Sequence, residues 1–156
     1  MRTGKKFAVF AAALTLAAGM ALAAAFWTAM PCAYAVVASG KASGRSIPGG
    51  TDEIRAAFLG SLGWQVDAEP LEHETVTIPY VFGDVYNNYN DIQKKQGFDL
   101  SGYRGRTVER YTYAVRNYPG VAEGVRANLL VYKGSIIGGD VCTAALGGFM
   151  QGLARP

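Results

Sequence analysis

The sequence predicts an α+β domain that follows an N-terminal membrane segment. Three observations support this prediction: an uncharged apolar run at the N-terminus, two stretches with apolar residues at steps of three and four, and alternation of apolar and polar residues in the C-terminal half. We expect an antiparallel sheet of about three to five strands, with two main helices packed on one face.

The N-terminal run has the features of a transmembrane helix. Arg2, Lys5 and Lys6 precede it, and residues 7–40 contain no charged side chain. Residues 7–30 are long enough to cross a hydrocarbon core, which takes about 20 residues. By the positive-inside rule the three cations hold the N-terminus in the cytoplasm, so we expect a single span in the cell membrane and an extracellular C-terminal domain.

A second interpretation of this run is a cleavable signal peptide. The sequence "AYA" at residues 33–35 resembles a small-x-small cleavage site, and cleavage after Ala35 would give a secreted domain. The length of the run favours the uncleaved anchor, because signal peptides usually have an apolar region of about 7–15 residues. We therefore divide the chain into residues 1–35, a flexible linker at residues 36–51 and a domain at residues 52–156.

The distribution of charge argues against nucleic-acid binding. The formal net charge is +3, but from residue 52 onward ten basic residues face twelve acidic ones. A nucleic-acid interface usually needs a basic domain with clustered Lys and Arg. Residues 52–91 are mainly acidic and residues 92–156 mainly basic, which predicts that the two halves pair and neutralise each other in the fold.

The domain is predicted to begin with a helix and a strand. Thr51 can cap the helix, and Gly63 fits its end. Residues 64–68 form a possible short strand, and residues 74–79 alternate as a strand that ends at a proline. The residues that recur at helical spacing in the first segment are Ile54, Ala57, Phe58 and Leu62.

A second helix is predicted between residues 84 and 96. Val85, Tyr89 and Ile92 fall at steps of three and four and are expected to face the core. Gly97 fits the left-handed residue after a helix end, and the next residue, a phenylalanine, fits the apolar contact that follows. The opposite face is polar and should be exposed: Asn87, Asn88, Asp91, Lys94 and Lys95.

An antiparallel meander is predicted for the C-terminal half. Residues 106–118 alternate as a half-exposed strand, with Tyr111, Tyr113 and Val115 on one face and Arg110, Thr112 and Arg116 on the other. Residues 125–142 predict a hairpin turning at Lys133–Gly134.

That turn would place Val131 opposite Ile136 and Ala127 opposite Asp140. The pair Gly138–Gly139 weakens the last strand or marks a bulge or a close approach. Residues 145–153 are interpreted as a short closing helix.

Several segments carry a family resemblance. They are "LGW" (62–64), "IP" (78–79), "VYNNYNDIQKKQGFDLSGYRG" (85–105), "RYTYAV" (110–115), "NYP" (117–119) and "IIGGDV" (136–141). On these residues the chain resembles the small domain-of-unknown-function proteins of Gram-positive bacteria that carry an N-terminal hydrophobic segment. The resemblance implies one extracytoplasmic domain and supplies no activity.

The candidates for chemistry are few. His73 is the only histidine, so a Cys142–His73 pair is the sole route to a thiol nucleophile assisted by imidazole. We expect instead that Cys142 packs in a strand, although a bridge to Cys32 is conceivable outside the cytoplasm. Glu72 and Glu74 flank His73 but would share the opposite side of a strand from it, which predicts solvated surface. We therefore expect no metal or other cofactor.

The best remaining feature is the number of tyrosines in the domain. They predict a core of amphipathic aromatic residues, with a Tyr/Asn/Arg interaction surface as the functional alternative, because tyrosine and arginine are favoured at interfaces. The candidate residues for that surface are Asn87, Asn88, Asp91, Lys95, Arg110 and Arg116.

The leading functional hypothesis is a membrane-anchored, non-catalytic binding or sensing domain. Its expected partners, besides the membrane, are an envelope protein, a peptide or a glycan. One alternative is an envelope enzyme that acts through carboxylates or Cys142. Another is a structural accessory subunit of a membrane complex.

Overall fold

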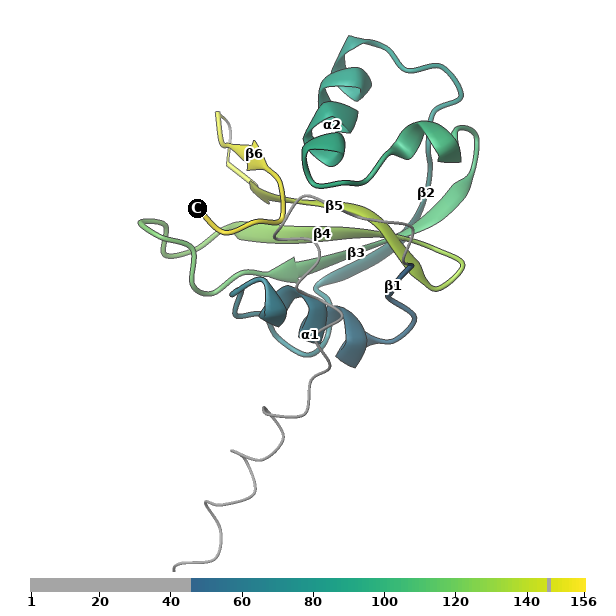
Figure 1. Cartoon of the computed structure of the whole chain (residues 1–156). Coiled ribbons are helices and arrows are strands. Elements are labelled where there is room, and N and C mark those ends of the chain that lie inside the picture. Colours follow the sequence, from purple (N-terminus) through teal and green to yellow (C-terminus); the bar gives the residue numbers. More distant parts are fainter. Residues whose placement is uncertain (1–45, 146) are drawn as a thin grey trace, which may run out of the picture. The chain divides into compact units, whose positions relative to one another are not determined.

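The computed structural model describes residues 46–145 and 147–156, which form an α+β domain, as predicted (Figure 1). An antiparallel sheet of six strands is accompanied by two α-helices and a 3-10 helix. The strands are β1 (Ile47–Pro48), β2 (Glu72–Thr77), β3 (Thr107–Ala114), β4 (Val125–Tyr132), β5 (Ser135–Thr143) and β6 (Met150–Gln151). The helices are α1 (Asp52–Ser61), α2 (Asp84–Lys95) and the 3-10 helix η3 (Leu100–Tyr103).

The strand order is β1-β5-β4-β3-β2, and β6 also pairs with β5. The sheet has six strands instead of the expected three to five. The two additional short strands, β1 and β6, have two residues each, which is too short for any alternation of side chains to be visible in the sequence.

The two α-helices cover opposite faces of the sheet (Figure 1). Phe58 and Leu59 of α1 join a core cluster on one face, and Tyr86 and Tyr89 of α2 pack on a second cluster on the other. The prediction that both helices lie on one face is therefore wrong. The polar side of β3 suggested a solvated face, but α2 covers that face and Thr112 is buried there.

Helix α1 begins and ends as predicted. The Thr51 hydroxyl accepts a hydrogen bond from the N–H of Ile54 at 3.4 Å. Gly63, just beyond the helix, has a φ of +88°, which a residue without Cβ adopts at little cost. The buried face holds Phe58 and Leu59 and, unexpectedly, Arg55, while the other predicted core positions of α1 are half-buried.

The end of α2 confirms the predicted stop. Gly97 has a φ of +86°, and its N–H donates to the carbonyl oxygen of Lys94 at 3.0 Å. The N–H of Phe98 donates to the carbonyl oxygen of Gln93 at 3.0 Å. These two hydrogen bonds form a Schellman motif.

The inward face of α2 differs from the prediction. Val85 is 86% exposed, whereas Asn90 and Gln93 are buried. Tyr89 and Ile92 are half-buried. The side-chain oxygens of Asn90 and Gln93 accept hydrogen bonds of 2.8 Å from the backbone N–H groups of Leu100 and Gly139, and the Asn90 amide donates to Asp99. These bonds favour the inward orientation, although the side-chain nitrogen of Gln93 is buried without a hydrogen-bond partner among the described residues, which has a cost.

The β4–β5 hairpin turns at Lys133–Gly134 and pairs Val131 with Ile136, as predicted. A register shift between Leu130 and Val131 then moves the remaining pairs, so that Asp140 lies opposite Asn128 and not opposite Ala127. One extra residue in a strand has this effect on every later pair.

Three short segments differ from their predicted structure. Residues 145–153 contain β6, which pairs with β5, so the predicted closing helix is wrong. Residues 47–48, within the stretch predicted as linker, form β1. In the possible strand at residues 64–68, Val66 forms an isolated bridge with Val115.

The acidic and basic halves of the domain pair as expected. Three ion pairs join acidic residues on or before β2 to arginines on or after β3: Asp67–Arg116, Glu72–Arg126 and Glu74–Arg110. All six side chains are substantially exposed, so each pair contributes at most about 1 kcal/mol.

The predicted transmembrane run, the cleavage site, Cys32 and most of the linker lie outside the described residues. Among the helices of residues 46–145 and 147–156, none combines the length and the apolar character that a membrane span requires.

Candidate functional site

A pocket of about 530 Å³ lies where β1, the β4–β5 turn and the chain after α2 meet. The rings of Tyr103 and Tyr132 line it and meet edge to face, with their centroids 5.5 Å apart. Phe98 and Ile136 add apolar wall. We call it the tyrosine pocket, and its volume lies in the range of about 300–1,000 Å³ that is common for ligand sites.

Two charged residues line the tyrosine pocket, Asp99 and Lys133. Hydrogen bonds from Ser101 and Asn90 lower the pKa of Asp99 to about 2, so this carboxylate is ionised at neutral pH. Lys133 supplies an exposed ammonium group. The pocket therefore combines aromatic surface with one fixed negative and one positive charge.

Local sequence positions these groups. Lys133 and Gly134 have φ values of +49° and +76°, which gives the tight turn that aligns Tyr132 with Ser135. Asp99 follows the Schellman motif of α2 and caps η3 by accepting a hydrogen bond from the N–H of Ser101 at 2.9 Å. A turn and a helix stop thus fix the two charges of the pocket.

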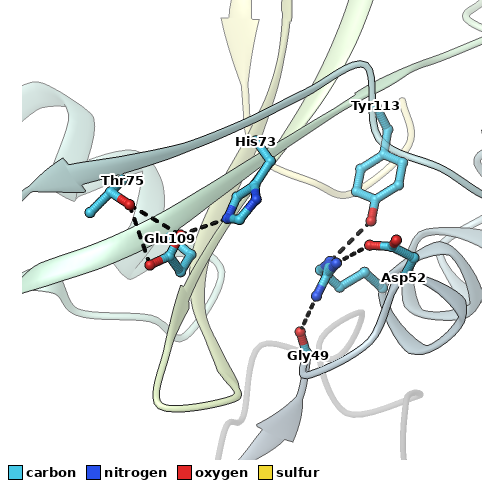
Figure 2. A network of polar contacts seen from close by, with 7 residues as sticks. Gly49, Asp52, His73, Thr75, Glu109 and Tyr113 are labelled. Atoms are coloured by element: carbon cyan, nitrogen blue, oxygen red, sulfur yellow. Dashed lines mark hydrogen bonds and ion pairs between the residues drawn. The ribbon is translucent and has the colours of Figure 1, made fainter.

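A second pocket, of about 410 Å³, lies at the start of α1 beside His73 and Tyr111, and we call it the histidine pocket. Figure 2 shows the polar contacts around it. The buried guanidinium of Arg55 donates to the carbonyl oxygen of Gly49 at 2.6 Å, to the Tyr113 hydroxyl at 3.0 Å and to Asp52. Arg55 therefore joins α1, β3 and the chain after β1.

Tyr111 is sandwiched in the wall of the histidine pocket. The His73 ring stacks on it with centroids 4.3 Å apart, and the guanidinium carbon of Arg55 lies 3.4 Å from the Tyr111 centroid. Two groups so close to one ring cannot share a face, so they lie on its two sides. His73 Nε2 is 2.6 Å from Glu109 Oε2, and the Thr75 hydroxyl donates to the same carboxylate (Figure 2). The contact with Glu109 orients the imidazole of His73, and the Thr75 hydroxyl donates to Glu109 and not to His73.

A third polar group lies under α2. Asp140 is buried on β5, where it accepts hydrogen bonds of 2.9 Å from the Tyr89 hydroxyl and from the Asn128 amide. Burial raises the pKa of Asp140, and hydrogen bonds from Asn128, Tyr89 and Cys142 oppose that rise. Burial and the Asp140 charge raise the pKa of Tyr89 and of the Cys142 thiol.

The candidate nucleophile and base are not brought together. Cys142 lies with Asn128 and Asp140 on the face that α2 covers. His73 stacks on Tyr111 on the face that α1 covers. A Cys142–His73 pair would have to reach through the sheet.

The predicted interaction residues fall into two groups. Asn87, Asn88, Asp91 and Lys95 lie together on the exposed face of α2. Arg110 and Arg116 lie on β3 and just after it, in ion pairs with Glu74 and Asp67. The residues of α2 form one surface, and their contact with a partner stays a prediction.

The two charges of the tyrosine pocket were not predicted from the sequence as site residues. Asp99 carried a usable signal, because an Asp directly after a helix stop and before "LSG" is a typical N-cap. Lys133 was noted only as a turn residue. No group of three or more His, Cys, Asp or Glu side chains suited to a metal ion occurs among the described residues.

The fold and the two pockets define a small α+β domain with a ligand-sized hollow. The family model that matches it is the domain of unknown function DUF4830, over residues 58–141. This match covers more than half of the 156 residues, and the chain belongs to that family. No curated protein and no solved structure matches the chain.

Proposed function

We propose that this protein is a membrane-anchored binding or sensing module whose domain lies outside the cell and holds its ligand in the tyrosine pocket. The observation that carries the proposal is the composition of that pocket, which Tyr103, Tyr132 and Phe98 line together with an ionised Asp99 and the exposed Lys133. Apolar walls with a few placed polar groups are typical of ligand sites.

The ligand class that suits this pocket is a short peptide or glycan segment of the envelope. Tyrosine combines a rigid apolar face with a hydroxyl, so it can contact a polar polymer without losing much side-chain entropy. The Asp99 carboxylate would pair with an amine or accept hydrogen bonds from hydroxyls, and Lys133 would pair with a carboxylate.

The position of the pocket supports a sensing role. Ser46 and Ile47 line it, so the linker joins the domain at the pocket wall. The strand β1 that follows has two pairs with β5, Ile47 with Ile136 and Pro48 with Ser135. A ligand that contacts Ser46 or Ile47 would stabilise this short strand, which gives binding a route to the linker.

The arrangement of the thiol supports binding over catalysis. A cysteine nucleophile acts as the thiolate, and burial next to Asp140 raises the pKa of Cys142 and so disfavours that form. An envelope enzyme acting through Cys142 or a carboxylate is the competing function, and a structural accessory subunit is another.

The test is a screen of the full chain in detergent against arrays of envelope peptides and glycans. Lys133→Asn removes the ammonium group and keeps a residue that tolerates positive φ, and Tyr103→Ala removes aromatic wall. We expect about ten-fold weaker binding in each variant, because each loses a contact worth about 1.4 kcal/mol. Gln65→Ala, at an exposed position that lines neither pocket, is the matched control and should bind as the parent chain does.

Two results would count against this function. Equal binding by the parent chain and both pocket variants would place the site elsewhere. If the parent chain turned over an envelope substrate and Cys142→Ser did not, the protein would be an envelope enzyme and not a binding module.

A further inference from the structure

Three large, exposed apolar side chains lie on the segment that runs from the end of β2 into the first turn of α2. Tyr80 is 78% exposed, Val81 79% and Val85 86%. Single exposed apolar residues are ordinary, but a group of them marks an interaction surface. We call these three residues the apolar loop.

The apolar loop is supported from below by ordered contacts. The ring of Phe82 packs against that of Tyr86 with centroids 4.6 Å apart, and the Arg104 guanidinium carbon lies 4.5 Å from the Phe82 centroid. The ring of Tyr80 lies close to Gly105, where an added Cβ would be 3.3 Å from its Cδ2 atom. The loop is therefore held in place, with the exposed Arg104 beside it.

The apolar loop begins three residues after the end of β2, and β2 ends at the end of the sheet where the linker enters. Thr77, at the end of β2, pairs with Thr107 at the start of β3, and Tyr132 and Ser135 close the β4–β5 hairpin at the same end. β1 pairs with the start of β5 there. Figure 1 shows β1 and the chain after β2 on the same side of the domain.

The tyrosine pocket lies beside both the linker and the chain that packs on the apolar-loop segment. Ser46, the first described residue, and Tyr103 both line it. Tyr103 directly precedes Arg104, which covers Phe82 of the loop segment. Tyr103 and Arg104 are thus adjacent residues, one in the pocket that the linker borders and one against the segment that carries the apolar loop.

With residues 7–30 anchored as proposed above, the length of the linker sets an upper limit on the distance between the bilayer and Ser46. Residues 36–45 span at most about 35 Å when fully extended. Tethering over such a distance gives a high effective concentration of the surface to which the anchor leads. The occupant always within reach of the loop is therefore lipid.

We propose that the apolar loop docks on the anionic lipid surface of the membrane that anchors the chain. Tyr80 suits the interfacial layer, where amphipathic aromatic side chains settle, and Val81 and Val85 suit the acyl boundary below it. Arg104 and Arg106, both exposed, lie next to the loop and complement anionic lipid phosphates. This inference rests on the anchoring part of the proposed function and is independent of the pocket ligand.

The experiment uses the full chain in vesicles of phosphatidylcholine and phosphatidylglycerol, in a Cys32→Ser, Cys142→Ser background. A spin label is attached at Val81→Cys or, as the control, at Asn88→Cys on the exposed face of α2. Flotation of the protein with the vesicles shows whether the N-terminal segment anchors the chain in the bilayer. The collision rates of the label with oxygen and with a water-soluble nickel chelate show whether the labelled residue lies in the lipid or in water, and so whether the loop is docked.

We expect the label at residue 81 to be exposed to oxygen and shielded from nickel, while the label at residue 88 collides with nickel freely. Val85→Asp should shift the docking equilibrium toward the undocked state about ten-fold, since burial of one aliphatic side chain is lost. Leu71→Asp, an exposed apolar position outside the loop, should leave docking unchanged.

The outcomes separate the inference from the proposed function. A chain that floats but collides with nickel equally at residues 81 and 88 overturns docking and leaves the anchor intact. A chain that fails to float overturns the anchor and this inference together, without bearing on ligand binding. Shielding of residue 81 that persists in detergent with a co-purified protein would assign the loop to a protein partner instead.

Discussion

The side-chain oxygen of Gln93 accepts a hydrogen bond of 2.8 Å from the backbone N–H of Gly139. Gly139 lies on β5 between the residues that pair with β1 and those that pair with β6, so it has no strand partner on that side among the described residues. Gln96 donates to the Gly139 carbonyl oxygen at 3.0 Å and accepts from the N–H of Leu153. Gln93 of α2 and Gln96, which directly follows the helix, thus provide hydrogen-bond partners for the edge of β5.

Gln93→Ala should destabilise the domain by about 1–3 kcal/mol, because it leaves the buried N–H of Gly139 without a partner. Urea unfolding followed by far-UV circular dichroism measures this. The matched control is Lys95→Ala on the exposed face of α2, which should change the free energy of unfolding by less than about 0.5 kcal/mol. Equal effects of the two substitutions would show that Gln93 contributes no more than a surface residue.

Gly139→Ala should be strongly destabilising. An added Cβ would lie 2.5 Å from the backbone oxygen of Asn128 and 2.9 Å from Leu153 Cδ1, so the sheet would have to move. Overpacking of this kind costs about 1–3 kcal/mol or more. Thermal unfolding measures it against Gly60→Ala in α1, where a Cβ meets nothing within 4 Å.

Gly60→Ala should stabilise the domain by about 0.5–1 kcal/mol, because alanine loses less backbone entropy than glycine in a helix. The opposite signs of the two substitutions are the expected result. A tolerated Gly139→Ala would mean that β5 can separate from its neighbours without cost.

Helix boundaries and hairpin pairing followed from local chemistry that the sequence displays. Thr51, Gly63, Gly97 and the Lys133–Gly134 turn each satisfy a backbone requirement within a few residues, so each was predictable. The orientation of α2 was not, because it depends on Gln93 meeting a gap in a strand more than forty residues away. Periodicity assigns polar residues to solvent, and two polar residues that fill a strand edge break that rule. The tyrosine pocket depends in the same way on long-range contacts.

Asp99 should make stability fall in acid. Its pKa in the folded domain is about 2, below the ordinary 3.8. A carboxylate with a lowered pKa adds stability above 3.8, and this contribution is lost as the pH falls through the folded value. Asp99→Asn keeps an oxygen for the N–H of Ser101 but cannot titrate. Urea unfolding at pH values from above 3.8 down to about 2 should therefore show the parent chain losing stability relative to the variant. The effect should be small and sensitive to salt because Asp99 is exposed.

Asp140 should produce the opposite dependence. Burial raises its folded pKa above the ordinary 3.8, so its contribution to stability is fully present below 3.8 and is lost as the pH rises through the folded value. In Asp140→Asn the amide oxygen can accept from Asn128, and the amide nitrogen can donate to the Tyr89 hydroxyl, which is able to accept as well as donate. All three polar groups then keep partners without a buried charge.

We therefore expect Asp140→Asn to gain stability relative to the parent chain as the pH rises above 3.8. Urea unfolding across this range measures the difference, and the exposed Asp91→Asn on α2 controls for the loss of one carboxylate from the chain. A gap between Asp140→Asn and the parent chain that stays constant with pH would show that Asp140 keeps its ordinary pKa. The pKa values of Asp99 and Asp140 are shifted in opposite directions from the same ordinary value of 3.8. The two single variants and the double variant therefore separate the two contributions to the pH dependence of stability. No hydrogen bond or ion pair between the two side chains is found in the described residues, so we expect their effects to add.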